Sequence, residues 1–382
     1  MNAVTKANWI SEDVEIFREA AGKFFAKECA PHAERWDEQG CVDRDIWNKL
    51  GEQGMLNVSI SEEYGGAGGN FAHEAVLCEQ QILNGGGGIG ISVHSGICAH
   101  YIQSYGTEEQ KREWLPKMAT GEKVCAIAMT EPGTGSDLQA VKTTAIKDGN
   151  EYVINGQKTF ITNGQQADYI IVVAKTDPAQ GAKGISLVMV EADTEGFSRG
   201  RNLKKLGMKS QDTSELFFDN VRVPMTNLLG SDEGMGFIQL MQQLPQERLI
   251  IAINSVTIMD MAIAETVEYT KERKAFGKSI ADFQNTRFKL AECKTKAVIA
   301  RTFVNTCMDA ILKGELDVTT AAMAKWWTTE ELNNVVDECL QLHGGYGFMW
   351  EYPITRMYAD SRVQKIFGGT NEIMKELIGR TL

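Results

Sequence analysis

Prolines and basic residues are scarce in this chain of 382 residues, and each shortage has a consequence. The sequence has 7 prolines, none of them between Pro245 and Pro353, so that segment can form long helices without a break. The 39 basic residues are outnumbered by 51 acidic residues, and the net charge of -12 has the wrong sign for a nucleic-acid-binding protein. A polyanionic ligand would therefore have to meet locally placed cations or backbone N–H groups.

Paired cysteines and long apolar runs are also missing. None of the eight cysteines belongs to a C-x-x-C pair, so we expect no metal site, no redox dithiol and a reducing compartment. Glu12, Asp13 and Glu15 stand where a signal peptide needs an apolar run and a transit peptide avoids acids, so we expect an already mature chain. The longest charge-free stretch, 80–107, is too polar for a spanning helix, and we expect no membrane span.

Hydrophobic patterns divide the chain into three parts, and the expected fold class is α+β. Apolar residues at helical spacing predict an all-α domain over 1–122 and a C-terminal helical bundle over 233–382. Between them, over 123–232, we expect a β domain whose strands include 151–161, 169–175, 184–192 and 214–223. One seam in the bundle repeats at spacings of three and four, which is typical of helix packing, and consists of Leu290, Cys293, Ala297, Ala300, Val304, Cys307 and Ile311.

Glycine-rich strings are the first candidates for ligand binding. Gly85, Gly87 and Gly90 satisfy the G-x-G-x-x-G pattern, but they follow a helical run rather than a strand, so we reject a dinucleotide-binding site. The string AMTEPGTGSDLQA, 128–140, opens the β region, and its N–H groups can face a flavin or a phosphate. Taken alone, it is nearly as well explained as a surface turn.

Two further strings lie at predicted helix ends. Gly344 and Gly345 fit the end of one helix, while Thr370 and Asn371 are plausible N-caps of another, whose N-terminus suits an anion or a polarised carbonyl. In LPQERLIIA we expect Glu247 and Arg248 in the first turn of an apolar helix. Taken alone, that carboxylate is better explained by the helix dipole than by catalysis.

Several motifs occur in order along nearly the whole chain: EEYGG near Glu63, MTEPGTGSD, KTFITNG at 158–164, ERKAFGKSI at 272–280, QLHGGYGF and a terminal GGTNEI. Together they resemble the acyl-CoA dehydrogenase family. The resemblance implies an N-terminal helical domain, a middle β-barrel or sandwich and a C-terminal four-helix bundle. It also implies FAD held between the last two parts, an acyl-CoA substrate and a homotetramer. Electrons would pass to an electron-transferring flavoprotein.

The resemblance is informative about the catalytic base. Most of the family carries a Glu in a C-terminal E-G-T string, where this chain has Gly368. The sequence instead resembles the long-chain branch, with the isovaleryl branch next, in which the base projects from an earlier helix at the position of Glu247. This assignment implies α,β-dehydrogenation of a long-chain or branched acyl-CoA to the trans-2-enoyl-CoA. We also expect the missing side chain at 368 to leave room for a bulky acyl group.

The resemblance assigns contacts residue by residue. Substrate contacts are expected at Ser136, Arg248, Gly368 and Gly369. Neighbouring subunits are expected to contribute Arg273, Gln284 and 341–345. The full set expected to hold FAD is Ile127, Thr130, Gly133, Gly135, Ser136, Phe160, Ile161, Thr162, Arg273, Gln284, Gln341, Leu342, His343, Gly344, Gly345, Thr370, Asn371 and Glu372.

Two rival functions remain open at this point. An acyl-CoA oxidase on the same fold would use oxygen as acceptor, and peroxide production would reveal it. A non-catalytic acyl-CoA or flavin-binding protein would lack the base, so Glu247 is the residue that argues against it. The location expected is the cytoplasm of a bacterium or the mitochondrial matrix for a mature eukaryotic chain.

Overall fold

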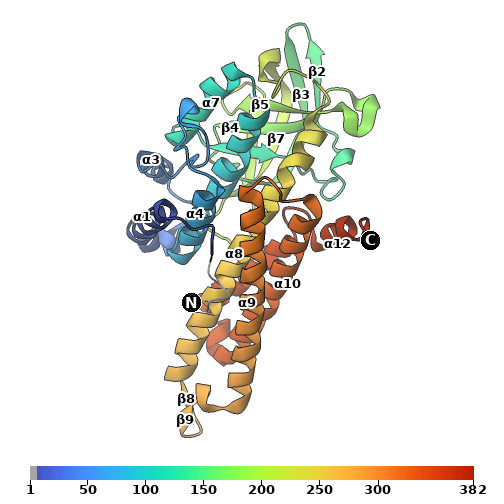
Figure 1. Ribbon diagram of the computed structural model, residues 1–382. Coiled ribbons are helices and arrows are strands. Elements are labelled where there is room, and N and C mark those ends of the chain that lie inside the picture. The colour runs from blue at the N-terminus through green and yellow to red at the C-terminus, as the bar shows by residue number, and fades with distance from the viewer. Residues whose placement is uncertain (1–6) are drawn as a thin grey trace.

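The computed structural model describes residues 7–382, so the first six residues of the predicted N-terminal domain lie outside the described residues. Helices come first, a sheet follows and long helices end the chain (Figure 1). The N-terminal helices are α1 (Glu12–Glu28), α2 (Ala33–Gln39), α3 (Asp45–Glu52), α4 (Phe71–Leu83), α5 (Ile91–Val93), α6 (His100–Tyr105) and α7 (Glu108–Ala119). A π-helical stretch, His94–Ala99, joins α5 to α6 without a break.

The middle part is a seven-stranded mixed sheet. Its strands are β1 (Cys125–Ala128), β2 (Thr144–Asp148), β3 (Glu151–Thr162), β4 (Tyr169–Lys175), β5 (Ile185–Glu191), β6 (Phe197–Asn202) and β7 (Thr213–Pro224). The order is β1-β4-β2-β3-β7-β6, and β5 pairs with β4. β1 runs parallel to β4, whereas β3 pairs antiparallel with β7. The four strands predicted from the sequence correspond to β3, β4, β5 and β7.

Long helices form the C-terminal part, in which α8 (Gly236–Glu272), α9 (Gln284–Leu312) and α10 (Val318–His343) pack side by side (Figure 1). The shorter α11 (Pro353–Ser361) packs on α8 and α10, and α12 (Asn371–Gly379) packs on α10. A small hairpin, β8 (Lys274–Ala275) and β9 (Lys278–Ser279), links α8 to α9. Most of the predicted α9 seam is buried, from Cys293 to Cys307.

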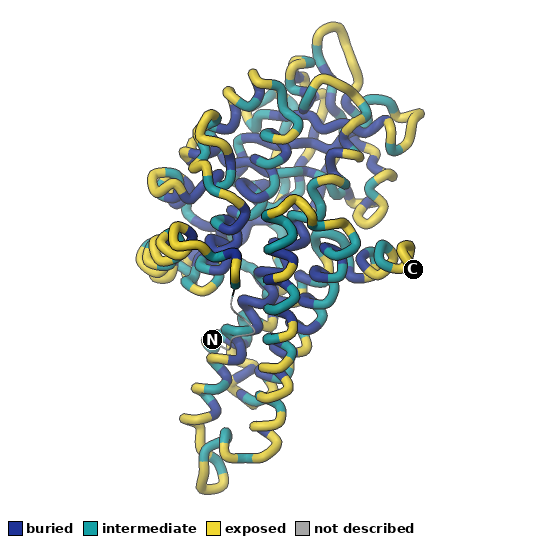
Figure 2. The backbone as a smooth tube through the Cα atoms, in the orientation of Figure 1, coloured by how far each residue is buried: buried dark blue, intermediate teal, exposed yellow. Residues whose placement is uncertain are grey.

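Helix α8 joins the three parts of the molecule. Its side chains pack in one core with α4, α9 and α10, and its start packs against β5. Figure 2 shows the buried backbone concentrated around this junction, while the far end of the bundle is more exposed. By length and composition α8 could cross a membrane, but 67% of its most apolar window is buried inside the protein. Packing in the core therefore accounts for its apolar character.

One predicted boundary is wrong. We expected Glu247 and Arg248 in the first turn of a helix, but α8 begins at Gly236 and continues through Pro245. A proline inside a helix removes one backbone hydrogen bond, and here the buried faces on both sides keep the helix continuous. Glu247 therefore projects from the middle of a rigid element, and the helix dipole does not explain its presence.

Candidate active site

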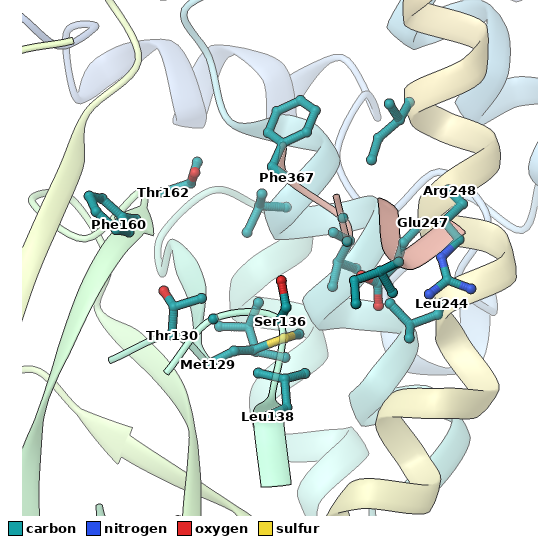
Figure 3. A pocket seen from close by; sticks show the side chains of 18 of the residues that line it. Met129, Thr130, Ser136, Leu138, Phe160, Thr162, Leu244, Glu247, Arg248 and Phe367 are labelled. Atoms are coloured by element: carbon teal, nitrogen blue, oxygen red, sulfur yellow. The ribbon is translucent and has the colours of Figure 1, made fainter. Parts of the chain in front are cut away.

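A cavity of about 410 Å³ lies where the three parts of the chain meet. Its walls come from the end of β1 and the loop after it, from β3, from α8 and from the segment before α12. Figure 3 shows Phe160, Thr162 and Thr130 on the sheet side and Glu247 on the helix opposite. The cavity therefore brings the glycine-rich loop, the KTFITNG motif, PQER and GGTNEI together, as the sequence motifs predict.

In the helical wall of the cavity, the carboxylate is that of Glu247. The side chain is buried, and Tyr101 Oη donates a hydrogen bond of 2.9 Å to its Oε1. Burial raises the pKa of Glu247 to about 7, although Tyr101, Arg248 and His100 all favour the charged form. A carboxyl with such a pKa can accept a proton near neutral pH and release it again.

A second buried group of charges lies behind Glu247. His100 Nε2 is 2.7 Å from Glu74 Oε1 and 3.0 Å from Ser59 Oγ. Burial alone would lower the pKa of His100, but the nearby Glu74 carboxylate outweighs burial and the pKa is raised. Ser59 and Glu74 approach the same ring nitrogen, so these residues do not have the geometry of a nucleophilic triad.

On the sheet side, a buried ion pair ties two motifs together. Lys158 of KTFITNG lies 2.9 Å from Glu131 of MTEPGTGSD, and its Nζ also donates to the Met129 carbonyl. Glu131 accepts two further bonds, from the N–H groups of Lys142 and Thr143. Although burial opposes ionisation of Glu131, these partners hold its pKa below the usual value. The glycine-rich loop is therefore fixed to β3 at its first residues.

Phe160 is presented to the cavity by an irregularity in β3. The pairing of β3 with β7 shifts between Lys158 and Ile161, and Phe160 has a φ of 60°, which is unusual for a residue with a side chain. Its ring is 68% exposed although the neighbouring residues are buried. Such a bulge re-aims one side chain out of the strand pattern, here toward the cavity.

The third wall is the turn Gly368–Gly369, where φ is 64° and 92°. A Cβ atom added to Gly368 would lie 2.3 Å from Ile251 Cδ1. The terminal methyl of Ile251, one helical turn beyond Glu247, therefore borders this position, while Gly368 itself lines the cavity. The room expected here for a bulky acyl group stays a prediction.

The predicted contact residues fall into two groups that lie apart in one chain. The first group lines the cavity and comprises Ile127, Thr130, Gly135, Ser136, Phe160, Ile161, Thr162, Glu247, Arg248, Gly368 and Gly369. The second lines a separate hollow of about 600 Å³ at the far end of the bundle and comprises Arg273 and 341–345. Gln284 begins α9 near that end. One chain therefore does not bring the two groups to the same site.

The remaining predicted residues have other surroundings. Gly133 belongs to the glycine-rich loop and has nothing within 4 Å of its Cβ position. Thr370 caps α12 by accepting from the Ile373 N–H, as predicted, and Glu372 lies in the first turn. Asn371 is the first helical residue rather than the cap, and its side chain is already bonded to Lys325, Thr329 and Glu330.

Arg248 is buried beside the cavity with an incomplete set of partners. The residue is 3% exposed, and its Nε and Nη1 have no hydrogen-bond partner within the described part of the chain. Unpaired guanidinium donors in a buried site are costly and suit a ligand oxygen. Over residues 7–382 no group of three metal-ligating side chains comes together.

Sequence reasoning missed four residues of this site, namely Tyr101, Lys325, Lys158 and Glu131. They act through contacts between segments that are separated in the sequence, and no spacing rule encodes such contacts. Lys158 and Glu131 left one signal, since they belong to the KTFITNG and MTEPGTGSD motifs.

Comparisons with known proteins agree along the whole chain. Three family models match it: the acyl-CoA dehydrogenase N-terminal domain over 11–122, the middle domain over 126–221 and the C-terminal domain over 234–382. The long-chain specific acyl-CoA dehydrogenase of Sus scrofa mitochondria is 50% identical over 374 residues, which cover 97% of this chain and 87% of that protein.

Solved structures give the same result. A crystal structure of acyl-CoA dehydrogenase from Geobacillus kaustophilus has a TM-score of 0.96 at 49% identity and covers 98% of this chain and 99% of that one. A glutaryl-CoA dehydrogenase from Mycobacterium smegmatis in complex with FADH2 has a TM-score of 0.91 at 28% identity, covering 98% and 95%. The chain belongs to the acyl-CoA dehydrogenase family of flavoprotein oxidoreductases, with the fold expected of it.

Proposed function

We propose that this chain dehydrogenates a long-chain or branched fatty acyl-CoA to the trans-2-enoyl-CoA, with Glu247 removing the proton from the α carbon. The observation that carries the proposal is a buried carboxyl, with its pKa raised to about 7, that faces the cavity from the middle of α8. Positioned general-base catalysis contributes roughly 10²- to 10⁴-fold to the rate. The resemblance to the long-chain branch and the glycine at 368 support the same assignment.

The residues present fit FAD, the cofactor of the family. The exposed ring of Phe160 offers a flat apolar surface, Thr130 and Thr162 place hydroxyls beside it, and Gly133 and Gly135 leave the loop open to close approach. When bound, FAD supplies the hydride acceptor for the β carbon. The second group, Arg273, Gln284 and 341–345, would hold the FAD of a neighbouring subunit in a homotetramer.

The Gly368 N–H is the group we propose for the thioester oxygen. No backbone or side-chain acceptor within 7–382 bonds this N–H, so it is free to donate to a ligand. A donor at this oxygen stabilises the negative charge that develops when Glu247 removes the α proton. Ser136 and Arg248 would contact the CoA portion, since one is exposed on the loop and the other carries unpaired donors.

Location and electron acceptor are further proposals. The family includes mitochondrial and bacterial enzymes, so the cytoplasm of a bacterium or the mitochondrial matrix is the proposed setting. We propose an electron-transferring flavoprotein as acceptor. Peroxide formed at the turnover rate under air would instead indicate the acyl-CoA oxidase.

Anaerobic titration of the yellow protein with acyl-CoAs of increasing length tests the proposed reaction. We expect the flavin absorbance to bleach and the enoyl-CoA to form, fastest with long or branched chains. An optimum at butyryl-CoA would contradict the substrate class. Acyl-CoA binding without bleaching would instead indicate the non-catalytic binding protein.

A further inference from the structure

Lys325 is a fully buried lysine on α10 that contacts the wall of the cavity from behind. Its Nζ donates to the Gly369 carbonyl at 2.7 Å and to Asn371 Oδ1 at 3.1 Å. Its exposed fraction is 0%. A lysine in such a place is uncommon, because the ammonium group loses its hydration and is compensated only by hydrogen bonds from the protein.

No carboxylate neutralises this lysine directly. Within 7–382 neither Lys325 nor Arg248 has an acidic group within 4 Å, although Glu372 and Glu330 attract Lys325 from farther away. Burial, followed by repulsion from Arg248, lowers the pKa of Lys325 to about 7. Two buried basic side chains thus lie beside the Gly368–Gly369 turn, and an apolar side chain would pack in the place of Lys325 at lower cost.

The turn depends on contacts from outside. Gly368 and Gly369 both have positive φ, and neither N–H has a hydrogen-bond acceptor in the described chain. Before the cap at Thr370, the Lys325 bond to the Gly369 carbonyl is therefore the polar contact that fixes the turn. Deleting it would leave two glycines, the most flexible residues, free to change conformation.

We propose that Lys325 is a positioning residue: it holds the Gly368–Gly369 turn so that the Gly368 N–H stays at the thioester oxygen. The inference rests on the proposed function. It assigns to α10, which contributes no side chain to the cavity lining, a role in stabilising the charge that forms on the substrate.

The variant that tests this role is Lys325→Met in the FAD-loaded protein. We expect normal FAD content, a KM within about threefold of the wild type and flavin reduction slowed by about 10²-fold, the size of effect seen when a transition-state donor is lost. The matched control is Thr329→Val. Thr329 lies one turn along α10 and bonds Asn371 but not Gly369, so we expect near-normal rates.

A spectroscopic readout separates positioning from general loosening. A 4-dimethylaminocinnamoyl-CoA absorbs at longer wavelength when its thioester carbonyl is polarised, and the measurement needs no turnover. We expect the red shift on binding to be smaller in Lys325→Met than in the wild type and unchanged in Thr329→Val. Lys325→Gln keeps a neutral donor, so its red shift should lie between that of Lys325→Met and that of the wild type.

The outcomes separate the two proposals. A wild-type red shift together with a wild-type reduction rate in Lys325→Met would overturn the role of Lys325. If Lys325→Met does not fold, the same pair of results in Lys325→Gln would overturn it. If the wild-type protein shifts the probe but no acyl-CoA bleaches its flavin, the proposed function fails, and the red shifts of the variants still decide the role of Lys325.

Discussion

At the scale of single residues, two groups in and behind the cavity wall have surroundings that oppose their charged forms. Glu247 is ionised only against the cost of burial, and Lys325 meets the same cost with the opposite sign. Groups perturbed in this way cluster at functional sites. Family resemblance identified Glu247, but its partner Tyr101 could not be predicted, because the bond between them joins residues 146 positions apart.

Removing the Glu247 charge should stabilise the fold at high pH. A carboxyl whose pKa is raised from 4.5 to about 7 by folding costs nothing below pH 4.5, and the cost grows with pH until it is complete above about pH 7. We therefore expect Glu247→Gln to gain on the order of 3 kcal/mol at pH 8 and little at pH 4.5. Thermal unfolding at both pH values measures this, and an equal gain at both would contradict it.

Tyr101→Phe should shift the pH dependence of catalysis. The Tyr101 hydroxyl donates to the carboxylate and so lowers the pKa of Glu247, and its loss should raise that pKa. The acidic limb of the pH profile of the flavin-reduction rate should then move to higher pH, and the rate at pH 7 should fall roughly tenfold. Tyr105→Phe is the control, since that hydroxyl bonds Gln239 and Gln242. A profile unchanged in Tyr101→Phe would rule out this role.

At the scale of elements, regular patterns were predictable and irregular ones were not. Strands β3, β4, β5 and β7 were found because their apolar runs are distinct, whereas β6 is short, polar and partly exposed. The start of α8 was missed because a proline suggests a helix start, and only packing on both sides explains its place inside a helix. The bulge at Phe160 has no sequence signal and sets one wall of the site.

Breaking the pair between Lys158 and Glu131 should loosen the glycine-rich loop and weaken FAD binding. Removing one partner of a buried ion pair leaves an uncompensated charge and typically costs about 3–5 kcal/mol. We expect Lys158→Met to lower both the unfolding midpoint and the FAD content after purification. Arg201→Gln is the control, because Arg201 is 80% exposed and its bond to Glu215 should contribute little. Full FAD content in Lys158→Met would refute the expected link between pair and cofactor.

At the scale of the whole molecule, the cavity of one chain is lined by seven of the 18 residues expected at FAD. Arg273 and 341–345 line a hollow far from the cavity, and next to it Phe276 at the tip of the β8–β9 hairpin is 95% exposed. A single exposed phenylalanine is ordinary on a protein surface, so the expectation that Phe276 meets a neighbouring subunit rests on its place beside the residues expected to come from that subunit. The distance between the cavity and this hollow could not be predicted from the sequence, since it depends on the length and direction of α8, α9 and α10.

Phe276→Asp should disturb the assembly and, with it, the cofactor. A charge at the hairpin tip would be buried on association, so we expect smaller particles by analytical ultracentrifugation and loss of bound FAD. Ile16→Asp offers a comparison, because Ile16 is also exposed but lies on α1, in the N-terminal part of the chain. A fully loaded Phe276→Asp protein of unchanged size would show that this face is free.

The most direct test of the central claim compares flavin reduction in the wild type and in Glu247→Gln. Both proteins are purified with FAD and mixed anaerobically with a long-chain acyl-CoA in a stopped-flow spectrometer. Gln keeps the size of the side chain and can still accept from Tyr101, but it cannot take the α proton. The account predicts tight acyl-CoA binding with reduction slowed by several orders of magnitude. Bleaching at a near-normal rate in Glu247→Gln would contradict it.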